Sequence, residues 1–256
     1  MKKVDRLPLS ETTLDFLWKR RLRIVEAGDK APRQSERRAA QYKEADDLWG
    51  GSYKSNKAFE EIRTTLRAMA PGHELCMYCE YIHGNAIEHF APMEKYPTSA
   101  FAWDNYLWSC TDCNSKYKGT QFPLDERGLP LLVNPTRDEP REHIGVSPLS
   151  GKVTGLTAKG SRTIKVLGFD RRGYLEKSRS SAWRAIQHYL VSYDEACTEG
   201  DEVRAMVVKT DLCQYPHASL LSLLIEVLEK PGGALLVAER RCGPILATYP
   251  EIKSWI

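Results

Sequence analysis

Two C-x-x-C pairs constrain this chain more than any other feature. They are Cys76-Met-Tyr-Cys79 and Cys110-Thr-Asp-Cys113, separated by about 30 residues. Each pair presents two sulfurs from a tight turn, and tetrahedral zinc is commonly held by two such pairs at Zn–S distances of about 2.3 Å. The spacing is longer than in most zinc ribbons but is compatible with one site. The sequence therefore predicts a zinc ion on Cys76, Cys79, Cys110 and Cys113, and a structural one, because all four ligands are protein side chains.

Redox catalysis by one of the pairs is the competing interpretation. A thioredoxin-like site needs a βαβ setting, which the surrounding pattern lacks, and two matched pairs favour metal. The chain has no run of 18 or more apolar residues and no secretory signal after Met1, so we expect a cytoplasmic protein without membrane contact, in which thiols stay reduced. Cys197, Cys213 and Cys242 are isolated, and we expect them to be small core residues.

The overall composition indicates a folded chain without a marked charge. Hydrophobic residues make up 42% and charged residues 28% of the sequence, enough for a real core. The net charge of +3, from 37 Lys and Arg against 34 Asp and Glu, does not by itself indicate a polyanionic partner. Any surface that binds nucleic acid must therefore be local.

The hydrophobic pattern divides the chain into three segments: a helical N-terminal region (1–70), a central core (71–136) and a mostly helical C-terminal region (137–256). Helical periodicity ends at Pro71-Gly72. Short apolar pieces such as Leu131–Val133 are compatible with strands or with loop. The helix expected over Pro216–Glu229 is apolar almost all round, which predicts burial or a docking surface. The predicted class is α+β, mostly helical.

The central segment predicts a small hairpin followed by a helix. Ala86–Phe90 fits a short strand, in which alternation sends Glu88 and His89 to opposite faces. Tyr106–Ser109 fits the returning strand, and the second cysteine pair opens a helix toward Lys118-Gly119. A unit this small buries too little apolar surface to be stable alone. Zinc that joins the start of the first strand to the start of the helix would supply the missing stability.

Three residues between and after the cysteine pairs match the needs of a metal-assisted phosphodiesterase. Such an enzyme needs a base for water and oxygen ligands for a hard cation, and Glu88, His89 and Asn114 supply that set. Lys116 and Lys118 follow at helical spacing, where contacts to flanking phosphates and a solvated helix end are equally compatible with the pattern. Trp103 and Trp108 are expected in the core rather than as base-stacking platforms.

These residues resemble the HNH, or ββα-metal, nucleases over Cys76 to Pro123. The resemblance rests on the acid-His pair with its following Pro92, on Asp104-Asn105 before the second strand, and on the Cys-x-x-Cys-Asn ending. It implies His89 as general base, Asn105 as the residue that fixes the loop orienting it, and Glu88 with Asn114 as ligands of a catalytic ion. Asn114 stands where many members carry histidine, and a neutral oxygen ligand suits Mg or Mn.

A narrower similarity extends beyond the cysteine pairs to the HNH nucleases of Septu-type and retron-associated phage-defence operons. It implies an effector nuclease that works with an ABC-type ATPase. The longer helical N-terminus and the Ala91-Pro92-Met93 stretch depart from the pattern, because a basic residue often follows that proline. The similar segments are Ile87–Phe90, Tyr96-Pro97, Phe101–Cys110, Cys113–Lys116, Lys118-Gly119, Thr163-Ile164 and Leu167–Arg171.

The sequence thus favours an endonuclease with a nucleic-acid substrate. We expect DNA more than RNA, but the residues themselves do not distinguish the two. The alternative is a zinc-knuckle subunit that binds nucleic acid or protein without catalysis. Such a module needs the cysteines but has no use for Glu88, His89 and Asn114 together. A third interpretation, an inhibitory or scaffold subunit whose helical flanks matter most, predicts tight complex formation and no metal-dependent cleavage.

Overall fold

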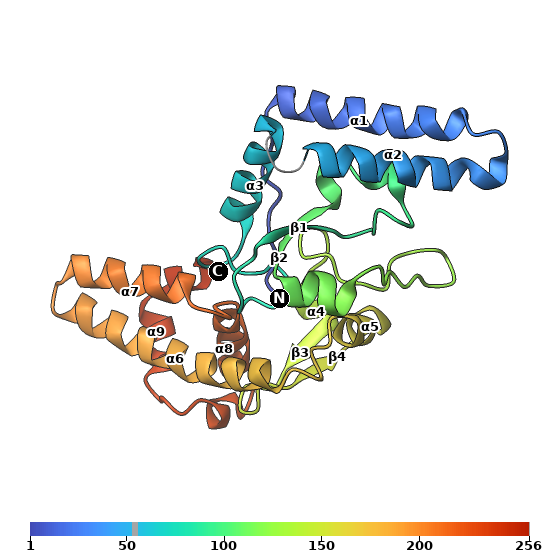
Figure 1. Ribbon diagram of the computed structural model, residues 1–256. Coiled ribbons are helices and arrows are strands. Elements are labelled where there is room, and N and C mark those ends of the chain that lie inside the picture. Colours follow the sequence, from blue (N-terminus) through green and yellow to red (C-terminus); the bar gives the residue numbers. More distant parts are fainter. Residues whose placement is uncertain (53–55, 256) are drawn as a thin grey trace.

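The computed structural model describes residues 1–52 and 56–255. It is mostly helical with two small antiparallel sheets, which confirms the predicted α+β class. The N-terminal helices lie at one end and the C-terminal helices at the other, with β1 and β2 between them and β3 and β4 beside α5 (Figure 1). In chain order the helices and strands are α1 (Glu11–Asp29), α2 (Arg37–Ser52), α3 (Lys57–Met69), β1 (Ala86–His89), β2 (Tyr106–Ser109), α4 (Pro140–His143), β3 (Ile144–Val146), β4 (Val153–Gly155), α5 (Ala158–Val166), α6 (Gly173–Thr198), α7 (Glu202–Gln214), α8 (Leu220–Glu229) and α9 (Cys242–Thr248).

Short single-turn helices complete the chain between these elements. They are η1 (Gln34–Glu36), η2 (Pro97–Ser99), η3 (Trp103–Asn105), η4 (Asp112–Lys118), η5 (Gly233–Leu236) and η6 (Pro250–Ser254). All are 3₁₀ helices except η4, a wider helix of seven residues that begins within the second cysteine pair and contains Cys113. The predicted helix toward Lys118-Gly119 is therefore present.

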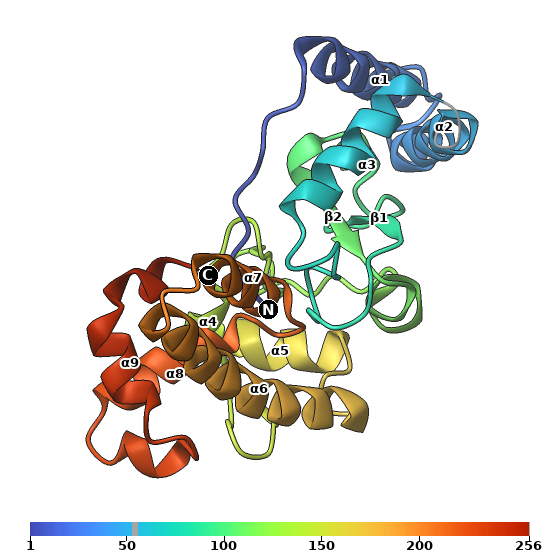
Figure 2. The same ribbon diagram turned by 90° about the vertical axis from the view of Figure 1, so that its left-hand side faces the viewer.

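The N-terminal region is a bundle of three helices, of which α1 and α3 begin with side-chain caps. The Ser10 hydroxyl accepts a hydrogen bond from Thr13 N at 3.3 Å, and the Asn56 side chain accepts one from Ala58 N at 2.8 Å, so α1 and α3 both begin at residues that satisfy their first free amides. Helices α1 and α2 run side by side in both views, and α3 leads down to the hairpin (Figures 1 and 2). The residues that fill this bundle include Leu17, Ile24, Phe59, Ile62 and Leu66.

The central hairpin has the predicted strands in one register. Ala86 lies opposite Ser109 and His89 opposite Tyr106. Gly84 precedes β1 against the indole of Trp108, where a Cβ would come within 2.1 Å of the ring, so a larger residue would push the strand entry off the hairpin. Trp108 is buried, as predicted for a core residue, and Trp103 is half-buried.

The first residues of the chain form an extended segment that bonds to the central hairpin and to the loop before α4. Val4 N donates to Pro135 O at 2.9 Å. The Arg6 guanidinium donates to Trp103 O at 3.2 Å and Tyr106 O at 2.8 Å, and lies 4.8 Å from the Trp103 ring centre. Figure 2 shows this segment running from the lower body up to α1. It therefore holds the base of β2 against the loop that precedes α4.

The segment after the hairpin forms the second sheet rather than a strand at Leu131–Val133. That piece is loop, and its backbone is satisfied by a side chain: Val133 N donates to Thr163 Oγ1 at 2.8 Å. The strands of this region are β3 and β4, which pair further along the chain, from Ile144 opposite Gly155 to Val146 opposite Val153.

Two apolar clusters divide the interior. The first joins the N-terminal helices, the hairpin, the second sheet, α5 and the start of α6, and it crosses both predicted boundaries, 70/71 and 136/137. The second joins α6 to α9 and contains Trp183, Ile186, Leu212, Leu221 and Leu224. Cys242 is buried in this second cluster as predicted, whereas Cys197 and Cys213 are half-exposed.

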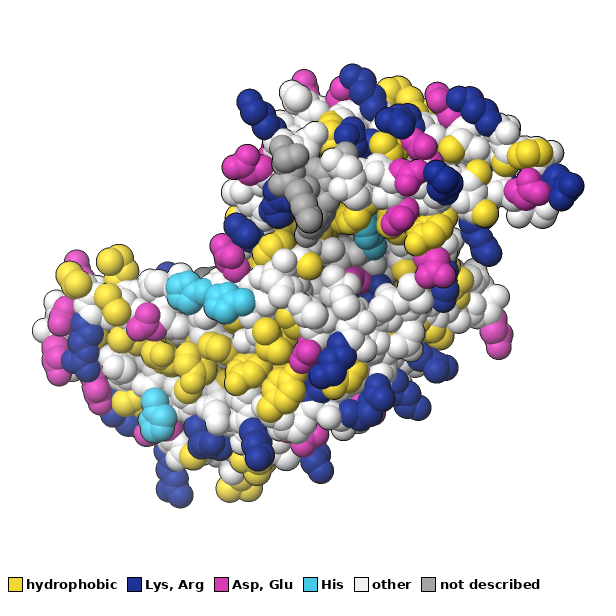
Figure 3. All heavy atoms as spheres, viewed as in Figure 1, with side chains coloured by type: hydrophobic (Ala, Val, Ile, Leu, Met, Phe, Trp, Pro, Cys, Tyr) yellow, Lys and Arg dark blue, Asp and Glu magenta, His cyan; other side chains and the backbone are white. Residues whose placement is uncertain are grey.

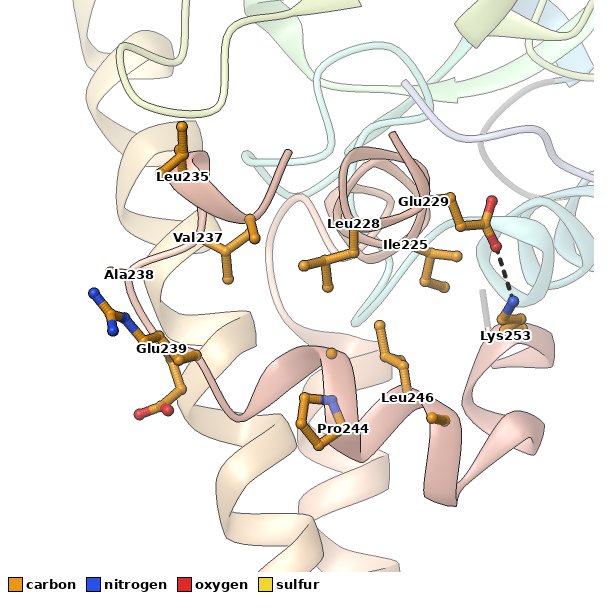
Figure 4. A pocket seen from close by; sticks show the side chains of 14 residues that line it. Ile225, Leu228, Glu229, Leu235, Val237, Ala238, Glu239, Pro244, Leu246 and Lys253 are labelled. Carbon is orange, nitrogen blue, oxygen red and sulfur yellow. Dashed lines mark hydrogen bonds and ion pairs between the residues drawn. The ribbon is translucent and has the colours of Figure 1, made fainter. Parts of the chain in front are cut away.

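Helix α8 is buried on one face, so the burial predicted for a helix apolar almost all round is present on that face. It begins at Leu220, later than predicted, because His217 has a left-handed backbone (φ 59°) that a helix cannot continue through. Its other face, with Ile225 and Leu228, lines a cavity of about 870 Å³ against η5 and α9 (Figure 4). Lys253 and Glu229 form an ion pair of 2.9 Å at its rim. No helix within 1–52 and 56–255 combines the length and apolar character needed to cross a bilayer.

His217 makes the stability of this fold sensitive to acid. Its ring is 2% exposed, lies 3.1 Å from the Ser178 hydroxyl and stacks on Tyr81. Burial lowers the pKa of His217 to about 3, against the opposing effect of Glu80. In the unfolded chain His217 takes up a proton near pH 6.5, whereas in the folded chain it stays neutral down to about pH 3. The contribution of His217 to the free energy of unfolding is therefore full above pH 6.5 and falls as the pH drops toward 3.

Replacing His217 with asparagine is expected to remove this acid sensitivity while keeping the left-handed turn, which Asn tolerates. Between pH 6.5 and 4, the free energy of unfolding of the wild type should fall more steeply than that of His217→Asn, by up to about 1.4 kcal/mol per pH unit. Urea unfolding at several pH values measures both slopes. Equal slopes would contradict the prediction, and His188→Asn, at an exposed histidine of α6, is the control.

Candidate active site and zinc centre

Four buried cysteines converge as the sequence predicts. The Sγ atoms of Cys76, Cys79, Cys110 and Cys113 all lie within 4.8 Å of one another. Zn–S bonds of about 2.3 Å in a tetrahedron put the sulfurs about 3.8 Å apart, and those of Cys79 and Cys110 are 4.0 Å apart. The number, chemistry and spacing of these donors fit a structural zinc ion.

Local backbone geometry builds the two cysteine turns. In the first turn Glu80 N donates to Cys76 O at 2.9 Å, and Glu80 itself has a left-handed backbone (φ 53°) that reverses the chain toward β1. In the second, Cys113 N donates to Cys110 Sγ at 3.4 Å. Met77 N donates to Trp108 O at 2.9 Å, which ties the first turn to β2. The four sulfurs therefore join the entry of β1 to the start of η4.

Glu88 lies inside the molecule beside a lysine. Its carboxylate is 2.5 Å from Lys118 Nζ, and the two side chains are 2% and 1% exposed. The same ammonium donates to His89 O at 2.9 Å. Burial raises the pKa of Glu88 to about 7, although Lys118 favours the charged form. Lys118 is thus buried and paired with Glu88. This differs from both interpretations of the sequence, a phosphate contact and a solvated helix end.

His89 is held by one hydrogen bond and an aromatic cage. Its Nε2 lies 2.9 Å from Ala100 O. A carbonyl oxygen only accepts, so Nε2 carries the proton and Nδ1 of the neutral ring keeps its lone pair. The ring lies 4.4 Å from that of Trp49 and 5.4 Å from that of Tyr106, measured between centres. Burial lowers the pKa of His89 to about 4, so the ring is neutral at pH 7.

Asn105 closes the loop between the two strands. Its Oδ1 accepts from Ala91 N at 2.7 Å, and its Nδ2 donates to Ala91 O and Ser99 O, each at 3.0 Å. One buried carboxamide thus binds both ends of the loop, and the second end directly precedes Ala100, the partner of His89. A carboxamide suits this position because it both donates and accepts.

Asn114 lies on η4, directly after the last cysteine. Gly119 N donates to Asn114 O at 2.7 Å, a five-residue spacing that makes this helix wider than an α-helix. Over residues 1–52 and 56–255, no hydrogen bond joins the half-exposed Asn114 carboxamide to Glu88 or His89. Lys116 is exposed, 3.9 Å from Asp112. Glu88 and Lys118 are thus in contact, and among the described residues the Asn114 carboxamide makes no hydrogen bond to Glu88 or His89.

Replacing Lys118 with methionine is expected to destabilise the fold by about 3 kcal/mol at pH 8, since it leaves a buried carboxylate without its cation. The loss should shrink at pH 6, where Glu88 takes up a proton. Urea unfolding measures both values. The exposed Lys116→Met on the same helix is the control, and the double variant Glu88→Gln with Lys118→Met should recover most of the loss. Equal stability of the Lys118 and Lys116 variants would refute the expectation.

Three contacts of the site could not be predicted from the spacing of residues in the sequence. Trp49 reaches His89 from α2, and the Ala100 backbone supplies the acceptor for its ring. Arg172 donates from its guanidinium to Cys113 Sγ, 59 residues away in the chain. The nearest signal was the Leu167–Arg171 stretch of the narrower resemblance, which ends one residue before Arg172.

The structure is a mostly helical α+β fold in which a four-cysteine cluster suited to zinc joins a two-stranded hairpin to a short helix. The chain matches no protein-family profile and no solved structure. It is 31% identical over 153 residues to the Septu protein PtuB of Bacillus mycoides (strain KBAB4), covering 46% of this chain and 50% of the relative. It is 34% identical over 128 residues to the Septu protein PtuB of Bacillus thuringiensis, covering 47% and 42%. The chain thus spans about half the length of these relatives, and over that part the similarity to Septu proteins is confirmed.

Proposed function

We propose that this chain is a metal-dependent HNH-type endonuclease that hydrolyses phosphodiester bonds of nucleic acid, DNA rather than RNA. The observation that carries the proposal is the state of His89. Its Nε2 is committed to Ala100 O, which leaves Nδ1 as an acceptor, and its ring is neutral at pH 7. A neutral imidazole fixed through one nitrogen has what a general base requires.

In the proposed mechanism, His89 Nδ1 takes a proton from the water that attacks the phosphorus. The bond from Nε2 to Ala100 O persists and favours the ring as it becomes charged, because the carbonyl is fixed by the loop that Asn105 closes. Glu88 and Asn114 would hold Mg or Mn. When bound, that ion would stabilise charge on the phosphate and on the departing oxygen. The resemblance implies a product with a 5′-phosphate.

The distribution of basic side chains supports a nucleic-acid substrate. Lys and Arg side chains gather over α5 and β4 on the face in Figure 3, while elsewhere on that face they mix with Asp and Glu. Exposed members on or beside these elements include Lys152, Arg162 and Lys165. Together with the exposed Lys116 on η4, they offer phosphate contacts that need no base recognition.

A role in anti-phage defence follows from the similarity to Septu proteins. The matched part of the chain and the narrower sequence resemblance support an effector nuclease that works with an ABC-type ATPase. The C-terminal helices lie outside the zinc unit and offer surface for such a partner. In this proposal the partner controls when cleavage occurs, and the zinc unit performs it.

One observation favours the alternative, a zinc-knuckle subunit that binds without cutting. The carboxylate proposed to hold a divalent ion already has the Lys118 ammonium beside it at 2.5 Å. A binding subunit would keep this pair as a structural element. An enzyme would require Lys118 to share Glu88 with the ion or to leave it.

The decisive experiment compares cleavage of plasmid, single-stranded DNA and total RNA by the zinc-loaded protein, alone and with the product of its neighbouring gene. Mg or Mn is added or omitted at fixed zinc, so that the structural site stays filled. Cleavage that needs the added ion and is lost in His89→Ala supports the enzyme. Binding without cleavage in every combination would overturn the proposal in favour of the knuckle.

A further inference from the structure

A buried arginine lies against the zinc ligands. The Arg172 side chain is 2% exposed, and its Nη1 and Nη2 both donate to Cys113 Sγ, at 3.4 and 3.3 Å. Nη2 also donates to Leu167 O at 2.7 Å. The guanidinium carbon lies 4.7 Å from the ring centre of Tyr117 and 5.0 Å from that of Phe169. The group is therefore fixed on several sides.

The charge of the site explains why a cation is useful there. Four thiolates and one zinc ion carry a net charge of about −2, and burying an uncompensated charge is costly. The other donors to the sulfurs are neutral: Cys113 N bonds Cys110 Sγ at 3.4 Å, and the Ser109 hydroxyl lies 3.5 Å from Cys76 Sγ. Among the described residues, Arg172 is the one cation hydrogen-bonded to a sulfur of the site.

The segment before Arg172 is built to deliver it. Helix α5 ends at Val166, and Gly168 follows in a left-handed conformation (φ 62°). A Cβ on Gly168 would lie 2.3 Å from the Tyr117 ring, so only glycine lets the chain pass so close to η4. This contact and the Leu167 carbonyl set the distance between Arg172 and Cys113.

We propose that Arg172 is a positioning residue of the zinc centre: it balances the thiolate charge, directs two hydrogen bonds to Cys113 and thereby slows loss of the metal. Through its contacts with Cys113 and Tyr117, Arg172 also holds η4, the helix that carries Asn114. The importance of this contact for a catalytic ion rests on the proposed function. The zinc effect itself does not depend on nuclease activity. Second-sphere donors of this kind typically contribute about 10–100-fold in metal affinity.

Arg179 provides a matched control. It is also a buried arginine, 6% exposed and 5.4 Å from the Phe169 ring centre. Its guanidinium donates to Gly151 O at 3.2 Å and, within the described part of the chain, to no sulfur. Arg179→Gln therefore removes a buried cation from the same region without removing a hydrogen bond to a zinc ligand. Any effect common to Arg172→Gln and Arg179→Gln reports general loss of packing or charge.

The test measures zinc content and the rate of zinc transfer to a chromophoric chelator in wild type, Arg172→Gln, Arg172→Lys and Arg179→Gln. Arg172→Gln is expected to hold zinc about 10–100-fold more weakly, Arg172→Lys to be intermediate because it keeps the charge but not the paired donors, and Arg179→Gln to resemble wild type. Cobalt in place of zinc should show a shifted thiolate-to-metal absorption band in Arg172→Gln alone. If Arg172→Gln does not fold, Arg172→Lys decides the matter. Zinc release equal to that of Arg179→Gln would overturn the proposal, whatever the nuclease assays show.

Discussion

His89→Ala is expected to slow metal-dependent cleavage by about 10²–10⁴-fold, the usual contribution of a general base. The substitution removes the one nitrogen proposed to take the proton from water. The ring makes one hydrogen bond, to a backbone carbonyl, and lies beside Trp49 and Tyr106 rather than within the sulfur cluster. The fold and zinc content should therefore survive, and the rate of product formation at saturating Mg or Mn measures the loss.

A second histidine of the same unit separates chemistry from general damage. His83 is exposed before β1, and its backbone pairs with that of Leu75, so His83→Ala should cut at the wild-type rate. Zinc content and circular dichroism of both variants confirm that each is folded. A folded His89→Ala protein that cuts as fast as His83→Ala would exclude His89 as the base.

Residues whose roles depend on local spacing could be predicted from the sequence. Two C-x-x-C pairs place their sulfurs through tight turns, and strand alternation separates the side chains of Glu88 and His89. Both features depend on neighbours within a few positions, and the structure contains the sulfur cluster and the two strands as expected. The end of α3 likewise follows from the local signal at Pro71-Gly72.

Contacts that join distant segments were not predictable in the same way. Lys118 follows Asn114 at a spacing that suggests an exposed helix end, yet the wide turn of η4 sends its ammonium inward to Glu88, 30 positions earlier. Arg172 reaches Cys113 because Gly168 packs against Tyr117, a contact that appears only when α5 is docked. The sequence did not decide between strand and loop at Leu131–Val133. The hydrogen-bond partner of this segment, the Thr163 hydroxyl, belongs to another element of the fold.

The zinc centre should matter more to the fold than any single contact described above. Structural zinc contributes an apparent 10–16 kcal/mol or so in small zinc domains, which rivals the roughly 5–15 kcal/mol stability of a whole protein. The four cysteines belong to the first apolar cluster, together with Tyr78 and Leu107 of the same unit. The second cluster, from α6 to α9, contains none of the four. Loss of zinc should therefore unfold the central unit and spare most of the C-terminal helices.

Cys110→Ser, or removal of zinc by a strong chelator, is expected to abolish bound zinc and to expose the backbone amides of β1 and β2 to rapid hydrogen exchange. Amides of α6 and α8 should remain protected, because their packing partners lie in the second cluster. Zinc analysis and residue-resolved hydrogen exchange measure the two effects. Cys197→Ser, at a half-exposed thiol near the end of α6, is the control and should match wild type in both. Protected strands in a zinc-free Cys110→Ser protein would show that apolar packing alone holds the hairpin. Any catalytic role of Glu88 and His89 would then be independent of the structural zinc.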